Sequence, residues 1–290
     1  MPLATRLVHA AVGVTGRVAP SLAARAVVPF FSRPLARLPL SRDETAVLAL
    51  AAQDVIQVGG HPVTVHTWGD GARPVLMVHG WKSRAACFSA FVAPLVARGF
   101  TPVAFDAPGH GASGGRASTI LDYVRAAELL HARHGRFAAV VGHSVGGLGA
   151  FLALRGRVTA DRLVTVSTPS SFPHVVDSFC AMTGVGETVK PALRRTLERR
   201  LFPGEDDLWN RFSPVHRPEQ LRLPVLAVHD RRDRAVPFGE AERLVAAYAD
   251  RADLFATDGL GHRRILADPG VVEAVLAFAA TGGHAPDLAA

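Results

Sequence analysis

Short apolar runs alternate with segments of helical periodicity along most of this 290-residue chain. Six of the runs have the length of one buried strand, and they lie at residues 74–78, 102–106, 137–141, 162–168, 223–230 and 253–257. Residues 118–134 predict a helix that begins after Ser118 or Thr119 and ends before Gly135. Strands that alternate with helices predict an α/β fold with a doubly wound, mostly parallel sheet.

Two segments depart from this alternation. Residues 54–58 and 62–66 flank a Gly-Gly pair and predict an antiparallel hairpin. Residues 1–45 carry apolar side chains at roughly helical spacing, interrupted by prolines, so we expect an N-terminal extension of two amphipathic helices packed on one domain, residues 46–290. A signal peptide is less favoured because Arg17 interrupts the apolar pattern. No uninterrupted apolar run reaches the ~18–20 residues of a membrane span.

A G-x-S-x-G motif, residues 142–146, directly follows the run at 137–141 and precedes an apolar helical segment. A strand, this motif and a helix form a nucleophile elbow, a sharp turn that lifts the serine hydroxyl above the sheet edge. Glycines at both ends of the motif let the strand and helix backbones pass closely. Chance could produce the motif in a glycine-rich chain, but the flanking elements favour Ser144 as a nucleophile.

A serine nucleophile needs a base, and the base needs an acid that orients it. Asp233 follows the predicted strand at 223–230, and His262 lies in a glycine-flanked loop after the last predicted strand. Both residues therefore follow the carboxyl end of a strand, in the chain order serine, aspartate, histidine that a hydrolase sheet uses. Asp230 and Asp258 are less favoured candidates for the acid, and we expect Asp258 to cap its own turn.

Acyl transfer also needs hydrogen-bond donors for the negatively charged oxygen of its intermediate. We predict the backbone N–H groups of Val145, next to the nucleophile, and of Trp81, in the loop after the strand at 74–78. The loop after the next strand carries three polar residues that we expect to shape it rather than to catalyse, namely Asp106, His110 and Ser113.

With these residues the chain resembles the α/β-hydrolase-fold serine hydrolases, a broad group of esterases, lipases and S33-like peptidases. The resemblance covers about residues 54–282 and rests on five matches, residues 79–81, 106–113, 142–146, 233–237 and 261–262. It implies the α/β-hydrolase fold and a Ser144–Asp233–His262 triad that requires neither cofactor nor metal. It does not specify the substrate, because this fold supports many reactions.

About 50 residues separate the strand that ends near 168 from the one that begins near 223, and most of them have a helical pattern. An excursion this long predicts a helical cap at about residues 172–216, over the active site. We expect bulky side chains to line a narrow acyl pocket, namely Trp81, His143, Phe172, Phe179, Met182, Phe202, Trp209 and Phe212. The alternative is that the cap residues only pack the cap against the core.

The formal net charge is +7 and the sequence pI is about 10.5. The positive charge is almost entirely arginine and is scattered, without a basic run interleaved with aromatic residues, so a nucleic-acid partner is disfavoured. The positive charge is only weak support for attraction to anionic substrates or membrane surfaces.

Cys87 and Cys180 lie far apart in the sequence and predict free thiols, which favours a cytoplasmic protein over one with disulfides. Peripheral membrane association is not favoured.

These features predict a serine hydrolase that cleaves small carboxylic esters of short to medium acyl chain through an acyl-enzyme. The same triad could instead act on thioesters, lactones or carbon–carbon bonds, or perform perhydrolysis. A non-catalytic binding module on this scaffold is a remote alternative, because the triad is complete.

Overall fold

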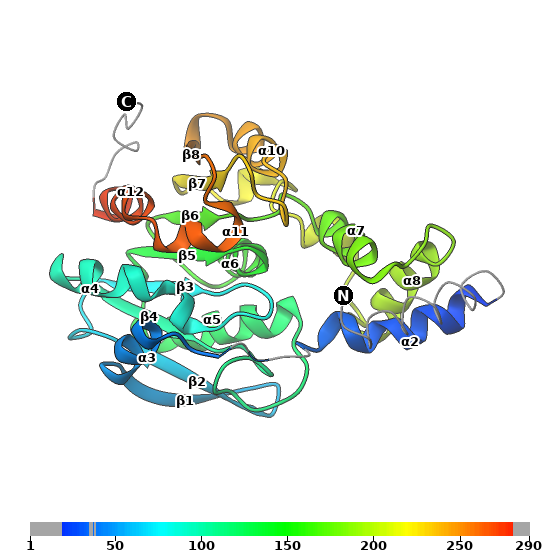
Figure 1. The fold of residues 1–290 in the computed structure, drawn as a ribbon, viewed down its shortest axis with the longest axis horizontal. Helices are drawn as coiled ribbons and strands as arrows, with labels where there is room; N and C mark the ends of the chain where they lie inside the picture. Colours follow the sequence, from blue (N-terminus) through cyan, green and yellow to red (C-terminus); the bar gives the residue numbers. More distant parts are fainter. Residues whose placement is uncertain (1–18, 35–36, 38, 281–290) are drawn as a thin grey trace.

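The computed structural model describes residues 19–34, 37 and 39–280. Eight strands form one sheet in the order β1-β2-β4-β3-β5-β6-β7-β8 (Figure 1). In chain order they are β1 (Ala52–Val58), β2 (His61–Thr67), β3 (Pro74–Val78), β4 (Thr101–Phe105), β5 (Ala139–His143), β6 (Leu163–Val166), β7 (Val225–Asp230) and β8 (Ala252–Thr257). β1 and β2 form the predicted antiparallel hairpin, and all pairs from β4 to β8 are parallel. The predicted fold class is confirmed.

Helices cover both faces of the sheet, as a parallel sheet requires. One face carries α3 (Arg42–Ala49), α4 (Ser89–Ala97) and α12 (Pro269–Ala280), and the other carries α5 (Ile120–His134), α6 (Val145–Arg155) and α10 (Gly239–Tyr248). β3 shows how one strand serves both cores. Its Val75 and Met77 pack under α4 and α12, whereas Leu76 and Val78 pack on the opposite face, under α5 and α6.

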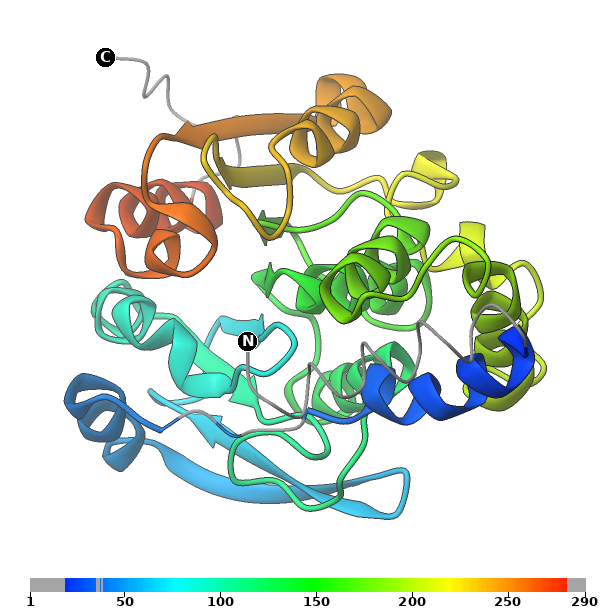
Figure 2. The same ribbon diagram turned by 45° about the vertical axis from the view of Figure 1, so that its right-hand side comes forward.

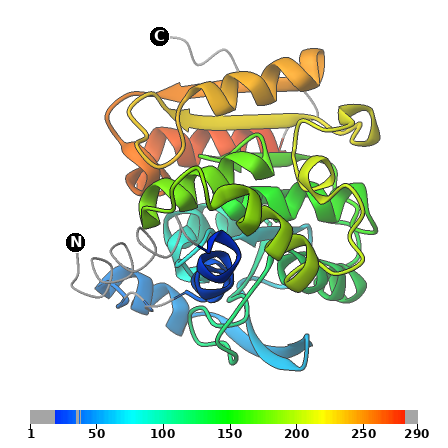
Figure 3. The ribbon, with the colours of Figure 1, turned by 90° about the vertical axis from the view of Figure 1, so that its right-hand side faces the viewer.

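A separate apolar cluster forms the cap beyond the carboxyl edge of the sheet. Between β6 and β7 the chain forms α7 (Phe172–Thr183), α8 (Lys190–Arg200) and α9 (Leu208–Arg211), within the predicted cap segment. α2 (Pro20–Ser32) lies alongside α8 (Figures 2 and 3) and on the opposite side of the molecule from α3 (Figure 1). The cap therefore consists of two segments that are distant in the sequence.

The N-terminal extension differs from its prediction. The first of the two expected helices falls within residues 1–18, outside the described residues. The second, α2, packs its buried Val27 and Val28 in the cap cluster with Leu193 and Leu197 of α8. α2 therefore packs on the cap segment within residues 46–290, whereas the core of the domain was the expected partner, because the cap provides the apolar partner surface.

The predicted domain boundary after residue 45 was also wrong, because it cuts through α3. Ser41 and Glu44 form a capping box at the start of α3, with hydrogen bonds of 3.1 Å from Glu44 N to Ser41 Oγ and 2.8 Å from Ser41 N to Glu44 Oε2. The indole N–H of Trp68 donates to the backbone oxygen of Val47 at 2.8 Å. α3 therefore belongs to the sheet domain.

Both cysteines are free thiols, Cys87 half-buried and Cys180 buried. Among the described residues, no helix combines the length and the apolar character that crossing a membrane would require.

The turn between β5 and α6 is strained and closely packed. Ser144 has φ 54° and ψ −127°, a conformation that non-glycine residues rarely adopt. Its backbone N–H donates to Val166 O on β6 at 2.9 Å, which fixes the turn against the sheet. A Cβ on Gly146 would lie 2.2 Å from Val78 O and 2.4 Å from His79 O. Only glycine fits there, so α6 begins in contact with the backbone at the end of β3.

We expect Gly146→Ala to disrupt this turn, because the new methyl group meets backbone atoms that cannot move away. The cost should be at least about 1–3 kcal/mol of unfolding free energy, the usual range of core overpacking. Gly186→Ala is the matched control, since a Cβ there has no atom within 4 Å. Urea unfolding of both variants checks the prediction, and equal stability of the two would contradict it.

Candidate active site

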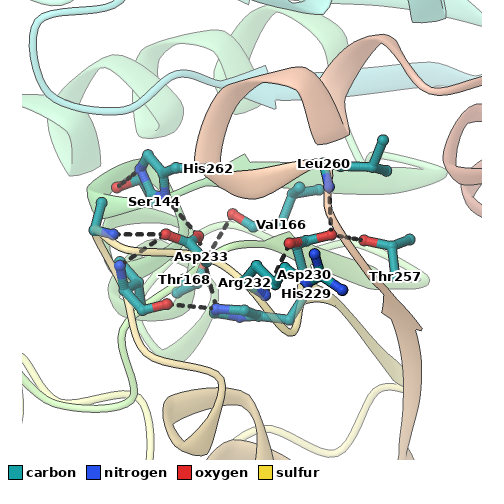
Figure 4. Close-up of polar contacts among 12 residues, drawn as sticks. Ser144, Val166, Thr168, His229, Asp230, Arg232, Asp233, Thr257, Leu260 and His262 are labelled. Atoms are coloured by element: carbon teal, nitrogen blue, oxygen red, sulfur yellow. Dashed lines mark hydrogen bonds and ion pairs between the residues drawn. The ribbon is translucent and has the colours of Figure 1, made fainter.

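Three polar side chains meet at the carboxyl edge of the sheet (Figure 4). Ser144 follows β5, Asp233 follows β7, and His262 lies on α11 (Gly261–Arg264), after β8. Ser144 Oγ lies 3.1 Å from His262 Nε2, and Asp233 Oδ2 lies 2.8 Å from His262 Nδ1. The Asp233 side chain is fully buried, whereas that of His262 is 21% exposed. The structure thus brings together the three residues predicted as a triad, in an arrangement in which the imidazole can accept a proton from the serine hydroxyl.

The surroundings of Asp233 keep its carboxylate ionised. Burial acts to raise its pKa, but hydrogen bonds from His262 and from the backbone outweigh burial, and the pKa is lowered. Its second oxygen, Oδ1, accepts from Ala235 N at 2.8 Å and from Val236 N at 3.0 Å. The loop after β7 therefore fixes one carboxylate oxygen and leaves the other for the imidazole.

Neither of the competing acids lies at His262. Asp230 Oδ2 accepts from Thr257 Oγ1 at 2.7 Å and from Leu260 N at 2.9 Å (Figure 4). Burial opposes ionisation of Asp230, but these hydrogen bonds lower its pKa to about 2. Asp258 Oδ1 is paired with Arg232 Nε at 2.5 Å. Asp230, the last residue of β7, instead joins the end of that strand to the end of β8 and to the residue before α11.

His143 was expected in the pocket, and that prediction was wrong. Its side chain is buried behind the site, where Nε2 donates to the backbone oxygen of His262 at 2.9 Å. Burial, with the neighbouring His262, lowers the pKa of His143 to about 3, so the ring is neutral. His143 holds the backbone of α11 in place and does not line the cavity.

The predicted oxyanion donors lie where β3 and α6 approach each other. A Cβ on Gly80 would lie 2.9 Å from Ser144 Cβ, so the loop after β3 passes directly beside the serine. Within the described part of the chain, the backbone N–H groups of Trp81 and Val145 donate to no acceptor. His79 supports this loop, since its Nδ1 donates to Gly80 O at 2.7 Å and its Nε2 accepts from Ala107 N at 3.0 Å. Two unused donors beside the Ser144 hydroxyl suit a negatively charged oxygen.

The polar residues after β4 shape their loop, as predicted. Asp106 Oδ1 accepts from Ala85 N and Oδ2 from Ala112 N, both at 2.7 Å. Ser113 Oγ accepts from Thr64 N at 2.8 Å, and His110 Nδ1 lies 3.0 Å from Pro108 O. These bonds connect the loop to neighbouring segments, and none of them involves Ser144.

A cavity of about 630 Å³ lies above Ser144 and His262, under the cap. Its walls are mainly apolar, and they include five of the residues predicted for the pocket, namely Trp81, Phe172, Phe179, Met182 and Phe202. The prediction was wrong for Trp209 and Phe212. Phe212 is fully buried against Phe172 and Phe202, with ring centroids 5.3 and 5.1 Å away, and the indole of Trp209 donates to Glu198 Oε1 at 2.6 Å. Both hold the cap together.

Sequence reasoning missed wall residues from outside the cap segment. Phe31, on α2, lines the cavity and makes edge contacts with Phe179 at 5.1 Å and Phe172 at 6.4 Å between ring centroids. Ile120 and Tyr123 of α5 also line it. Phe31 stands four residues after the buried Val27, on the apolar side of α2, and that spacing was the available signal.

Comparison with known proteins agrees with this architecture. A serine hydrolase-like protein of Danio rerio is 33% identical over 136 residues, which are 42% of this chain and 40% of that protein, so the chain matches less than half of that relative's length. A non-heme chloroperoxidase, CPO-A1, of Kitasatospora aureofaciens is 27% identical over 241 residues, 67% of this chain and 86% of the relative.

A solved esterase from Exiguobacterium antarcticum superposes with a TM-score of 0.61 at 16% identity, over 79% of this chain and all of the esterase. At that identity the likeness concerns the fold alone. The Alpha/beta hydrolase family matches residues 75–286. This range contains the strands β3 to β8, apart from the first residue of β3, and the cap helices α7 to α9. The chain therefore belongs to the alpha/beta hydrolase family.

Proposed function

We propose that this hydrolase cleaves carboxylic esters of short to medium acyl chain through an acyl-enzyme on Ser144. The observation that carries the proposal is the continuous contact from Asp233 through His262 to Ser144 at the floor of an apolar cavity. An apolar cavity of this volume suits the acyl part of a small ester.

In the first step His262 Nε2 takes the proton of Ser144 Oγ while Oγ bonds to the ester carbonyl carbon. The carbonyl oxygen becomes negative and accepts hydrogen bonds from the Trp81 and Val145 N–H groups. Asp233 holds the proton of His262 on Nδ1 and stabilises the imidazolium that forms.

The intermediate then breaks its bond to the alcohol oxygen, which leaves with the proton from His262 Nε2. In the second half a water molecule gives a proton to the same nitrogen and attacks the acyl carbon. The carboxylic acid is released, and the proton returns to Ser144 Oγ. The distances among Ser144, His262 and Asp233 support this sequence of steps.

Perhydrolysis is a second candidate activity, favoured by the similarity to a non-heme chloroperoxidase. In that reaction the acyl group passes from Ser144 to hydrogen peroxide and leaves as a peracid. Formation of peracetate from acetate and hydrogen peroxide tests it. A rate no higher than that of Ser144→Ala would exclude it.

We expect Ser144→Ala to reduce hydrolysis of p-nitrophenyl butyrate by several orders of magnitude, because the nucleophile is removed. The variant should still fold, and a fluorophosphonate probe should label the wild type but not the variant. Retention of more than about a tenth of the wild-type kcat would overturn the role of Ser144.

The two aspartates after β7 should differ sharply in their effect on kcat. Asp233→Asn should lower it on the order of 10⁴-fold, because the amide favours the wrong imidazole tautomer. Asp230→Asn should cost far less, since Asp230 contacts the loop and not the imidazole. Steady-state kinetics gives kcat for both variants. A larger loss of kcat in Asp230→Asn than in Asp233→Asn would make Asp230 the acid.

The preferred acyl-chain length should be set by the space that the cavity wall leaves for the chain. Each methylene that fits gains up to ~0.8 kcal/mol, so kcat/KM for p-nitrophenyl esters should peak between about C2 and C8. Phe31→Ala should move the peak to longer chains, whereas Phe30→Ala, the neighbour that does not line the cavity, should not. A monotonic rise to palmitoyl esters would show a longer groove than the structure has.

A further inference from the structure

Three cationic side chains line the cavity, and each follows a residue of the proposed catalytic arrangement in the sequence. Lys82 follows Trp81, Arg234 follows Asp233, and Arg263 follows His262. Arg234 and Arg263 are exposed and Lys82 is half-buried, so the three charges lie where the cavity opens to solvent. Two loops and the short helix α11 thus bring positive charge to one opening.

No acidic side chain in the described cavity wall opposes these charges. The described residues that line the cavity include no aspartate or glutamate, and within the described ranges none of the three cations has an ion-pair partner. Arg232, two residues before Arg234, contrasts with them because it is paired with Asp258. The opening therefore carries uncompensated positive charge.

Two other charged or titratable side chains at the cavity, His174 and Asp233, have partners of their own. His174 Nδ1 faces the buried Glu240 Oε1 at 3.6 Å, and its Nε2 lies 3.1 Å from Ser178 Oγ. The negative charge of Asp233 is fully buried against His262. Positive charge around an apolar, low-dielectric wall focuses its field on the space that a substrate enters.

The position of the charges also distinguishes the two parts of an ester. His262 must protonate the departing oxygen, so the alcohol part lies beside α11, which carries Arg263. The acyl part has the apolar wall of the cap, including Phe179 and Phe202. Guanidinium groups pair well with carboxylate and phosphate oxygens.

We propose that the preferred substrates are acyl esters whose alcohol part carries an anionic oxygen group, a carboxylate or a phosphate, bound by Lys82, Arg234 and Arg263. This inference rests on the proposed function and adds the charge of the substrate to it. The anionic group increases kcat/KM by steering the ester to the opening and holding its alcohol part beside His262.

The test compares 4-carboxyphenyl butyrate with 4-carbamoylphenyl butyrate, esters of similar shape that differ in charge. The wild type should favour the carboxylate about tenfold in kcat/KM at low ionic strength, as expected for three exposed pairs, and much less in ~0.5 M NaCl. 4-Phosphonooxyphenyl butyrate, with its larger negative charge, shows whether phosphate is preferred to carboxylate.

The triple variant Lys82→Ala, Arg234→Gln, Arg263→Gln should bring the ratio of the two rates close to one. Arg157→Gln is the control, because this exposed arginine follows the far end of α6 and does not line the cavity. The three single variants provide the same comparison if the triple variant does not fold. A wild-type ratio near one, or an unchanged ratio in the variants, overturns the inference while ester hydrolysis stands.

Binding separates the inference from the proposed function. 4-Butoxybenzoate and 4-butoxybenzamide are ethers that no hydrolase step consumes, and calorimetry gives a Kd for each. If neither butyrate ester is hydrolysed, ester hydrolysis fails as the function. Tighter binding of the benzoate, lost in the triple variant, still supports the anion site, and equal binding of both ethers overturns it.

Discussion

The close approach of α6 to the end of β3 is the constraint on which the site depends. Gly146 lies so near Val78 O and His79 O that no side chain can stand between them. This approach places the first turn of α6 beside the loop after β3, and it requires the strained backbone of Ser144. The serine hydroxyl and both candidate oxyanion donors are therefore positioned by backbone packing, before any side-chain contact is considered.

The residues around Ser144 could be predicted because each lies next to the carboxyl end of a strand. In a parallel sheet these ends share one edge, so local apolar runs and their order were enough to bring Ser144, Asp233 and His262 together. The sequence favoured Asp233 over Asp230, but the physical reason for the difference needed coordinates. It depends on which backbone N–H groups occupy each carboxylate, and no residue pattern encodes that.

The cavity wall was less predictable, for a physical reason. A helix in the cap has its apolar side against other cap helices as well as against the cavity, and the sequence does not distinguish the two environments. Phe212 and Phe202 are both fully buried aromatics, yet only Phe202 reaches the cavity. Phe31 was missed because α2 joins the wall from the other end of the chain.

The packing of α2 on the cap has a consequence for synthesis. The apolar side of α2, including Ala23 and Val27, leaves the ribosome long before Leu193 and Leu197, the surface that buries it. The segment must remain without its partner while the whole sheet up to β6 is made. Native contacts between such distant residues form late and slowly, so the nascent chain exposes an apolar helix through most of translation, a natural site for a chaperone to bind.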